Sequence, residues 1–327
     1  MRVFIAGGAG YVGSRLVPFL LDRGHEVMVA DLLWFGNALP SSVPVLQKDI
    51  FSLTEADLRG FDAVVFLAGL SNDPMAEYSP AMNFISNGAA PTYLAYIAKR
   101  AGVRRYVYAG SCSVYGHIDS TTLATEETEP RSVYPYGISK LKGEFGVLRM
   151  HDHDFSVICL RKGTVGGWGP RMRFDLLLNT MFMHASKTGK LTVNNPDIWR
   201  PILAMSDAIH AHERALVAPS SVQGIFNIHT ENITVGEAAR RVCEYFKTRR
   251  GQAVDVFTKH IPDARNYRVS HDRAVRELAF HPRGSVETIL ADLDANIGKD
   301  FNYDDDRFYN IKMFEKLLVD KTRVGIL

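Results

Sequence analysis

Two side chains four residues apart, Tyr136 and Lys140, could carry out proton transfer in this sequence. On a helix, positions i and i+4 share one face, so the phenol and the ammonium would be neighbours. A free tyrosine has a pKa of about 10 and is a poor base at neutral pH, but an adjacent positive charge favours the phenolate. The pair therefore predicts an acid–base centre on one helix.

A third candidate, Ser111, lies in the segment Ala109–Gly116, directly after an apolar strand predicted at Arg105–Ala109. In open parallel sheets, ligands bind at the carboxyl ends of the strands. A hydroxyl at this position could bridge a substrate oxygen to Tyr136. Ser111 and its neighbour Ser113 could equally serve only the turn, by hydrogen bonding to its backbone.

Three glycines, Gly7, Gly10 and Gly13, follow the apolar run Val3–Ala6 at the spacing of a dinucleotide-binding turn. Positions without a side chain let the backbone approach a pyrophosphate, and the following helix supplies free N–H groups. A second apolar strand leads to Asp31, whose carboxylate can accept both hydroxyls of an adenosine ribose. The sequence thus predicts a bound dinucleotide, and an oxidised nicotinamide would add a second positive charge near the phenol.

Apolar strands alternate with amphipathic helices through the first half of the chain, which predicts an α/β fold built on a doubly wound parallel sheet of the Rossmann type. A local kink is expected at Pro18, because proline removes a backbone hydrogen bond from a helix interior. The predicted strands are Val3–Ala6, Glu26–Ala30, Val43–Lys48, Ala63–Leu67, Arg105–Ala109 and Ser156–Arg161. The predicted helices are Tyr11–Arg23, Thr54–Leu58, Met82–Arg100 and Pro135–His151.

The pattern becomes irregular after Arg161, which indicates a smaller, discontinuous α/β domain for the substrate. A helix from about Asp207 and a buried strand at Gly224–Ile228 are expected to return to the first domain. Three features are predicted between Arg161 and Asp207. They are a glycine-rich segment at 163–170, a helix at Asp175–Thr188 and a polar stretch at Thr192–Trp199. The dinucleotide-binding domain is therefore assigned to residues 1–161 and 204–228, and the substrate domain to residues 162–203 and 229–327.

Composition and charge exclude several classes of protein. The chain has 327 residues, 46% of them hydrophobic, and a formal charge of +2, so there is no electrostatic case for binding nucleic acid or an anionic membrane. No apolar run is long enough to span a bilayer. Cys112, Cys159 and Cys243 lack metal-ligand spacing and favour a reduced, cytoplasmic setting. Two histidine pairs spaced i, i+2 cannot share a helix face, so we expect no zinc site.

Taken together, these residues resemble the extended short-chain dehydrogenase/reductases, and within them the nucleotide-sugar epimerase/dehydratase group. The resemblance covers nearly the whole chain, and its motifs are more specific for the superfamily than for the reaction. They are the glycine turn with Asp31, Asp49-Ile50, Leu67-Ala68-Gly69-Leu70, Asn87-Gly88, Ser111 with Val114-Tyr115-Gly116, Pro135-Tyr136-Gly137 with Lys140, Leu160-Arg161, and Arg200-Pro201 with Asp207.

The resemblance implies NAD as the cofactor and a nucleotide-diphosphate sugar as the substrate. It makes Tyr136 the acid/base, Lys140 its electrostatic partner and Ser111 the orienting hydroxyl, while Asp31 favours NAD over NADP. The other residues implied at the cofactor are Gly7, Gly10, Tyr11 and Val12 at the pyrophosphate, Asp49 and Ile50 at the adenine, and Leu67, Ala68, Gly69, Asn87, Tyr136 and Lys140 along the channel. Those implied at the substrate are Ser71, Ser111, Ser113, Thr164, Arg171, Arg173, Asn179, Arg200 and Arg265, each arginine having a solvated position as the alternative.

The implied reaction begins with oxidation at carbon 4 of the sugar. The Asp-Glu pair of a 4,6-dehydratase is replaced by Cys112-Ser113, which disfavours elimination, and we interpret Cys112 as a small buried residue rather than a catalytic thiol. A 4-epimerase needs no further acid or base and is the activity we predict. The alternatives are a 4-dehydrogenase or 4-reductase, and a non-catalytic NAD-sensing protein. Lys162 stands where many relatives have an aromatic residue. Its side chain could contact the substrate or be solvated.

The helices Met82–Arg100 and Pro135–His151 are expected to lie side by side on the sheet. The second carries an apolar stripe of Leu141, Phe145 and Leu148, which an intramolecular core would explain. Relatives use this helix pair to form a four-helix bundle between two subunits, so the resemblance implies a homodimer.

Overall fold

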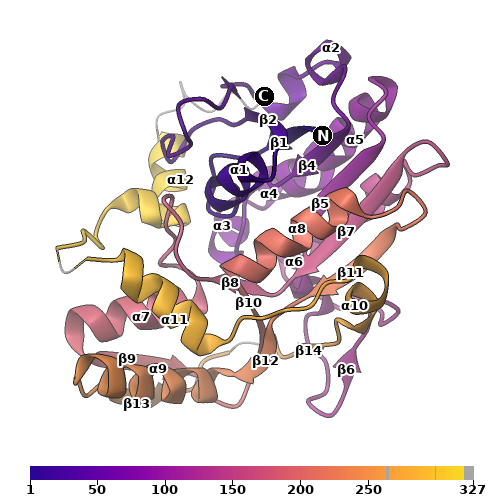
Figure 1. Ribbon diagram of the computed structural model, residues 1–327. Helices are drawn as coiled ribbons and strands as arrows, with labels where there is room; N and C mark the ends of the chain where they lie inside the picture. The colour runs from indigo at the N-terminus through magenta and orange to yellow at the C-terminus, as the bar shows by residue number, and fades with distance from the viewer. Residues whose placement is uncertain (263–264, 299, 320–327) are drawn as a thin grey trace.

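The computed structural model describes residues 1–262, 265–298 and 300–319, and its centre is a parallel seven-stranded sheet with the order β11-β7-β5-β4-β1-β2-β3 (Figure 1). The chain starts at β1, builds the sheet toward one edge, and then crosses back to extend it from β4 toward the other. The predicted doubly wound parallel sheet is therefore confirmed. Its strands are β1 (Arg2–Ala6), β2 (Glu26–Ala30), β3 (Val45–Leu46), β4 (Ala63–Phe66), β5 (Arg105–Ser111), β7 (Ser156–Lys162) and β11 (Gly224–Ile228).

Helices cover both faces of this sheet (Figure 1). Successive strand residues point to opposite faces, so Val107 packs beneath one helical layer and Tyr106 and Tyr108 beneath the other. This demand for burial on both sides explains why the strands read as continuous apolar runs. One layer contains α1 (Gly13–Asp22) and α8 (Met205–Val217), and the other contains α2 (Glu55–Leu58), α5 (Ala90–Arg100) and α6 (Pro135–Leu148).

The helix predicted at Met82–Arg100 is present, and it contains a π-helical turn. It consists of α4 (Pro80–Phe84), a π-helical turn at Ile85–Ala89 and α5, and it is preceded by α3 (Asp73–Tyr78). Pro91 has no N–H to donate to the Asn87 carbonyl, which instead accepts a hydrogen bond from the Tyr108 hydroxyl at 3.2 Å. The predicted helical run is therefore confirmed with one irregular turn inside it, and α1 continues through Pro18.

Three small sheets and four further helices lie beside the main sheet (Figure 1). Part of the predicted polar stretch Thr192–Trp199 is strand, because Leu191 and Val193 alternate with exposed neighbours and point into the core. The sheets are β12 (Glu231–Thr234), β10 (Trp199–Ala204) and β8 (Thr164–Gly166); β13 (Asp255–Lys259) and β9 (Lys190–Asn194); and β14 (Arg268–Val269) and β6 (Leu123–Ala124). The helices are α7 (Leu177–Thr188), α9 (Val235–Arg250), α10 (Asp272–Leu278) and α11 (Val286–Asn296).

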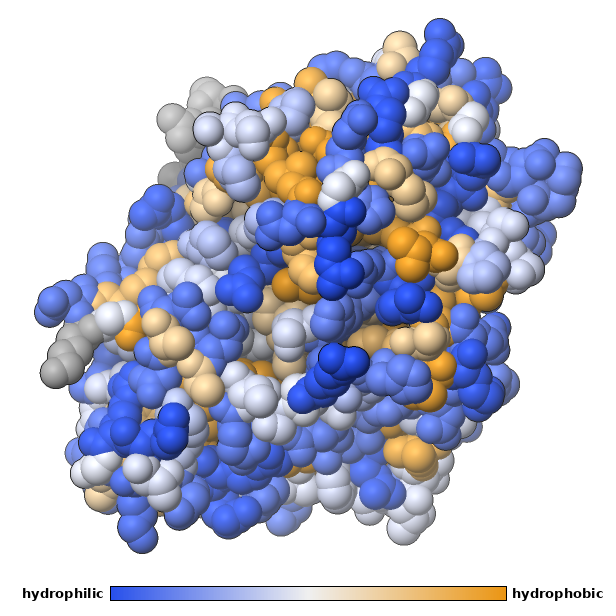
Figure 2. Space-filling model, in the orientation of Figure 1, coloured by the Kyte–Doolittle hydropathy of each residue, from blue (hydrophilic) through white to orange (hydrophobic). Residues whose placement is uncertain are grey.

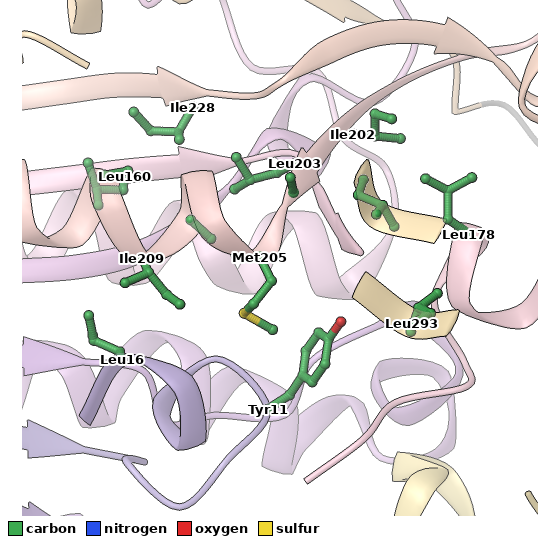
Figure 3. Close-up of a cluster of buried hydrophobic side chains, with 14 of the residues drawn as sticks. Tyr11, Leu16, Leu160, Leu178, Ile202, Leu203, Met205, Ile209, Ile228 and Leu293 are labelled. Atoms are coloured by element: carbon green, nitrogen blue, oxygen red, sulfur yellow. The ribbon is translucent and has the colours of Figure 1, made fainter. Parts of the chain in front are cut away.

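One apolar cluster joins the main sheet to these smaller elements (Figure 3). Leu160 from β7 and Met205 from α8 share it with Leu178 from α7 and Leu293 from α11. The Tyr11 ring, from the glycine turn, extends into the same cluster (Figure 3). The two parts of the chain are thus packed against each other, and the domain boundaries at 161, 204 and 228 stay a prediction.

The C-terminal helix α12 (Asn310–Val319) returns to the N-terminal half of the molecule (Figure 1). Its Phe314 is fully buried against Leu70 and Met75 and stacks on Trp34, with ring centroids 6.1 Å apart. The face drawn in Figure 2 is largely hydrophilic, with apolar side chains confined to patches. Among the described residues, no helix has the length and apolar character needed to cross a membrane.

Candidate functional site: a cleft at the carboxyl ends of the strands

A cleft of about 610 Å³ opens at the carboxyl ends of the central strands, where the direction of the sheet order reverses. This is the position at which doubly wound sheets bind ligands. A second cavity of about 150 Å³ adjoins it and is lined by Asp31, Asp49 and Ile50. The walls that both cavities share include Gly7, Gly10, Leu67, Ala68 and Gly69.

The glycine turn between β1 and α1 fits only residues without a side chain. Gly7 has a φ of +78°, and a Cβ at this position would lie 2.4 Å from the backbone nitrogen of Ala68. A Cβ on Gly13 would lie 2.3 Å from the carbonyl oxygen of Gly8. The turn is therefore pressed against the loop after β4 and exposes backbone to the cleft, as pyrophosphate binding requires.

Asp31 ends β2 at the wall of the smaller cavity. Its carboxylate accepts the N–H groups of Ala9 at 3.0 Å and Leu33 at 2.8 Å, and burial raises its pKa. A carboxylate has about four lone-pair sites, so acceptor capacity remains for two ribose hydroxyls. With the glycine turn beside it and Asp49 and Ile50 on the wall, this cavity fits the adenosine half of a dinucleotide.

Tyr136 lies at the start of α6 and faces the cleft, with its hydroxyl hydrogen-bonded to Ser111. The Ser111 hydroxyl donates to the Ser113 hydroxyl at 3.0 Å, and all three residues line the cleft. Burial raises the pKa of Tyr136 to about 12, while Ser111 and the charge of Arg173 oppose that shift. In the protein alone, desolvation thus outweighs the stabilisation of the phenolate that the sequence predicted.

Lys140 is one turn along α6, and its ammonium lies close to the strand β5. It donates to the Ala109 carbonyl oxygen at 3.1 Å and sits 5.2 Å from the centroid of the Tyr108 ring. Burial, together with the charge of Lys162, lowers the pKa of Lys140 to about 7. The ammonium is therefore held at the sheet rather than by a carboxylate, and it is available to a ligand in the cleft.

The arginines of the cleft already have protein partners. Arg173 makes two hydrogen bonds to Asp175, at 2.9 and 3.0 Å, and a third to the Ser71 hydroxyl at 2.9 Å. Arg265 is ion-paired with Asp73, and Arg200 donates to the Arg265 carbonyl oxygen. These contacts fix the guanidinium groups at the cleft wall, where their remaining N–H groups can bind a diphosphate.

Not every residue assigned from the sequence reaches the cleft. Asn179 is fully buried, accepts from the Gly167 N–H, and donates to the Tyr11 hydroxyl and the Arg173 carbonyl. Asn87 lies beneath the loop after β4, where it donates to the Leu70 carbonyl at 2.7 Å. Both amides support the walls of the cleft rather than form them. The other assigned residues line one cavity or both: Gly7, Gly10, Tyr11, Val12, Asp31, Asp49, Ile50, Leu67, Ala68, Gly69, Ser71, Ser111, Ser113, Tyr136, Lys140, Thr164, Arg171, Arg173, Arg200 and Arg265.

Phe35 and Asn310 are among the residues at the cleft that were not predicted from the sequence. Phe35 lines both cavities and carries the Arg171 guanidinium 3.6 Å above its ring. Asn310, at the start of α12, accepts from Arg171 and donates to the Ser71 hydroxyl at 3.0 Å. Phe35 follows Asp31 closely, which was a usable signal, but nothing in the sequence near Asn310 indicates that the chain returns to this cleft.

The cysteine that follows Ser111 has a structural role. Cys112 is 1% exposed, its pKa is raised by burial, and its Sγ lies 3.1 Å from the Arg161 carbonyl oxygen, which agrees with a small buried residue. Among the residues that the structure describes, no cluster of three or more histidine, cysteine, aspartate or glutamate side chains could hold a metal ion.

Comparison with curated proteins finds several sugar-nucleotide enzymes. A UDP-glucose 4-epimerase of Azospirillum brasilense is 33% identical over 180 residues, which cover 53% of this chain and 51% of the relative. The chain therefore spans about half the length of that relative. A UDP-glucose 4-epimerase of Corynebacterium glutamicum is 25% identical over 317 residues, covering 89% and 94% of the two chains.

Solved structures share the fold over nearly the whole chain. The UDP-glucose 4-epimerase of Thermus thermophilus in complex with NAD has a TM-score of 0.78 and 26% identity, covering 90% of this chain and 98% of the other. MoeE5 in complex with UDP-glucuronic acid and NAD has a TM-score of 0.78 and 25% identity, with coverages of 89% and 97%.

A family model adds the most direct result. The model described as the NAD dependent epimerase/dehydratase family matches residues 3–228, which contain the glycine turn, Asp31, Ser111, Tyr136 and Lys140. This stretch is more than half of the chain and contains all seven strands of the parallel sheet except Arg2, the first residue of β1. The cofactor of the family is NAD, and both cavities fit it. The chain belongs to the NAD-dependent epimerase/dehydratase family, as its sequence motifs predicted.

Proposed function

We propose that this protein is an NAD-dependent nucleotide-sugar 4-epimerase. The observation that carries the proposal is the Tyr136 phenol, which is hydrogen-bonded to Ser111 and lines a cleft whose carboxylates are both engaged. Among the described residues of the cleft, Asp73 is ion-paired with Arg265 and Asp175 with Arg173. Neither carboxylate is placed as the additional acid or base of a dehydratase.

The cofactor residues divide between the two cavities. Asp31, Asp49 and Ile50 would hold the adenosine half of NAD, and the backbone of the glycine turn would hold its pyrophosphate. A 2′-phosphate would meet the Asp31 carboxylate, which favours NAD over NADP. NAD, when bound, supplies the hydride acceptor and donor for the sugar carbon.

The chain's own residues would manage the proton. Ser111 orients the sugar hydroxyl toward Tyr136, and the phenolate form of Tyr136 removes its proton. The Lys140 ammonium, held at the Ala109 carbonyl, reduces the cost of that phenolate in a buried site. After the keto sugar has rotated in the cleft so that its other face is presented, the same Tyr136 returns the proton to the carbon-4 oxygen. A single acid–base residue is thus sufficient for the whole cycle.

The diphosphate of the substrate would bind among the cleft arginines. Arg200 and Arg265 lie together at the wall, joined by a hydrogen bond from the Arg200 guanidinium to the Arg265 carbonyl oxygen. Arg173 lies close enough to Tyr136 to lower the pKa of its phenol, so we assign it to the end of the diphosphate next to the sugar.

The deciding experiment follows the fate of the hydride. Purified protein loaded with NAD is incubated with a panel of nucleotide-diphosphate sugars, and the sugar is followed by NMR and reduced nicotinamide by absorbance. Inversion at carbon 4 without net reduced cofactor is the expected result. Stoichiometric reduced cofactor with a keto sugar would instead assign a 4-dehydrogenase, and a substrate that binds without any reaction would overturn catalysis.

A homodimer through the α5 and α6 helices completes the proposal. Phe145 on α6 is 64% exposed and Tyr96 on α5 is 48% exposed. Large side chains exposed on two neighbouring helices are typical of a self-complementary interface, in which the same pair of helices from a second copy would cover them.

A further inference from the structure

Lys162 is the last residue of β7 and occupies the floor of the cleft. Its register partner on β5 is Ser111, so the two side chains lie next to each other on the same face of the sheet. Lys162 lines the cleft together with Tyr136 and Lys140. The ammonium therefore belongs to the part of the cleft where the proposed hydroxyl pair acts, rather than to the outer wall.

The cleft carries an excess of positive charge. In the described part of the chain, six cationic side chains line it against two carboxylates, and each carboxylate is paired with an arginine. The six are Lys140, Lys162, Arg171, Arg173, Arg200 and Arg265. Two diphosphate groups, one from the cofactor and one from the substrate, would offset part of this charge, and the arginines suit that task by geometry.

Lys162 differs from the other cations because it has no counter-group among the described residues. No hydrogen bond or ion pair joins its ammonium to a described protein atom, whereas Lys140 has the Ala109 carbonyl and Arg173 has Asp175. Its charged neighbours, Arg173 and Lys140, are both positive. Burial lowers the pKa of Lys162 to about 8, which still leaves the ammonium form predominant at neutral pH.

Lys162 is half-buried and faces the open cleft, so its ammonium, which has no protein counter-group among the described residues, is suited to pair with an anion on the ligand. The diphosphates belong to the glycine turn and the arginine wall, whereas Lys162 is at the sheet floor beside Ser111. We propose that Lys162 binds a carboxylate carried by the sugar, and that the preferred substrate is a nucleotide-diphosphate uronic acid. This inference rests on the proposed nucleotide-sugar function.

The test compares pairs of sugars that differ only in that carboxylate. NAD-loaded protein is titrated by calorimetry with nucleotide-diphosphate glucose and the matching glucuronic acid, in uracil, thymine and guanine forms, and the base that binds most tightly is retained. Wild-type protein is expected to bind the acidic sugar about tenfold or more tightly than the neutral one. Tighter binding of the neutral sugar would overturn the proposal.

The variant Lys162→Met keeps the aliphatic stem and removes the charge. It is expected to lose about 10- to 100-fold in affinity for the acidic sugar and less than about threefold for the neutral sugar. Lys162→Arg should recover most of the preference, and Lys142→Met, at an exposed position of α6, should leave it unchanged. An equal loss on both sugars would place Lys162 in the shared chemistry and would overturn the assignment to a carboxylate.

Parallel NMR of the sugar separates this proposal from the 4-epimerase proposal. Inversion of either sugar at carbon 4, without a Lys162-dependent preference, would leave the epimerase standing and refute the carboxylate site. A Lys162-dependent preference for the acidic sugar without inversion would support the carboxylate site and refute the 4-epimerase. Deuterium uptake from D2O at carbon 5 that disappears in Lys162→Met would make Lys162 a base. This outcome would also refute the carboxylate site.

Discussion

The half-buried Tyr136 has a phenol that is desolvated in the wall of the cleft. Its pKa of about 12 arises from desolvation, which neither the Ser111 hydrogen bond nor the charge of Arg173 cancels. A phenol of this kind stays protonated at neutral pH. The positive charges that would favour the phenolate come from Lys140 and from the oxidised cofactor.

Replacement of Tyr136 by Phe is expected to lower kcat by about 10²- to 10⁴-fold, because the proton can no longer be exchanged with the sugar hydroxyl. NAD affinity, measured by fluorescence titration, should change little. Tyr93→Phe is the matched control, since its hydroxyl donates to the Leu53 carbonyl at 2.8 Å and Tyr93 lines neither cavity. Full turnover in the Tyr136 variant would remove the phenol from the mechanism.

Lys140 predicts a pH dependence of stability in the cofactor-free protein. Its folded pKa is about 7, while a lysine in the unfolded chain titrates at about 10.4. Between these values the unfolded state binds the extra proton, so wild-type stability rises with pH in this window.

Comparison of wild type with Lys140→Met isolates this group. The variant gains stability relative to wild type below pH 7, because the buried ammonium is removed, and that gain should shrink by about 2 kcal/mol or more toward pH 10. Urea unfolding from pH 6 to 10 measures it, and Lys142→Met should show no such trend. A gain independent of pH would mean that Lys140 titrates normally.

The site residues that could be predicted from sequence are those whose role follows from the backbone. Gly7 and Asp31 are placed by a strand ending and a turn, and both line the cavities. Asn87 and Asn179 were implied by the family resemblance, and their amides make hydrogen bonds within the protein. The direction in which a buried polar side chain points depends on packing between distant segments, and one sequence does not contain it.

At the scale of elements, one buried ion pair connects the helix that carries Tyr136 to the central sheet. Arg161 on β7 donates two hydrogen bonds to Glu144 on α6, at 2.9 and 2.6 Å, and a third to the Tyr115 hydroxyl at 2.8 Å. Both charged side chains are almost completely buried. The pair therefore fixes α6 against β7, and with it the orientation of the acid–base residue.

Removal of one member of this pair is expected to be costly. Arg161→Met leaves the Glu144 carboxylate buried without its partner and should lower the free energy of unfolding by about 3–5 kcal/mol. The double variant Arg161→Met/Glu144→Leu should recover most of that loss, because no charge is then left in the core. Urea unfolding at neutral pH measures both, and equal losses in the two variants would contradict the account.

The order of the strands could be predicted because parallel crossovers leave few topologies, whereas interruptions within elements could not. The π-helical turn at Ile85–Ala89 depends on Pro91 and on the Tyr108 hydroxyl of another strand. The strand β9 is short, and polar residues surround its two buried residues, so the stretch resembles a polar loop when its sequence is read alone. In each case the deciding partner is remote in sequence.

For the whole molecule, the exposed faces of α5 and α6 predict the oligomeric state. Light scattering after size exclusion should give the mass of a dimer at micromolar concentration. Phe145→Glu should shift it to a monomer, because a carboxylate would be buried between the two helix pairs. Phe257→Glu, at a side chain 51% exposed on β13, is the matched control and should remain dimeric. A monomeric wild type would remove the homodimer from the proposal.

The return of α12 to the N-terminal half has a thermodynamic consequence for the cofactor. Phe314 packs on Trp34 and Leu70, which also form the wall of the cavity assigned to adenosine. Linkage makes the effect of helix docking on NAD binding equal to the effect of NAD binding on helix docking, and a wall ordered by one contact is expected to favour the other. NAD should therefore slow amide hydrogen exchange along 310–319, and Phe314→Ala should weaken NAD by the same factor that it loosens the helix. The protection of α12 against hydrogen exchange would therefore report whether NAD occupies the adenosine cavity beside the glycine turn.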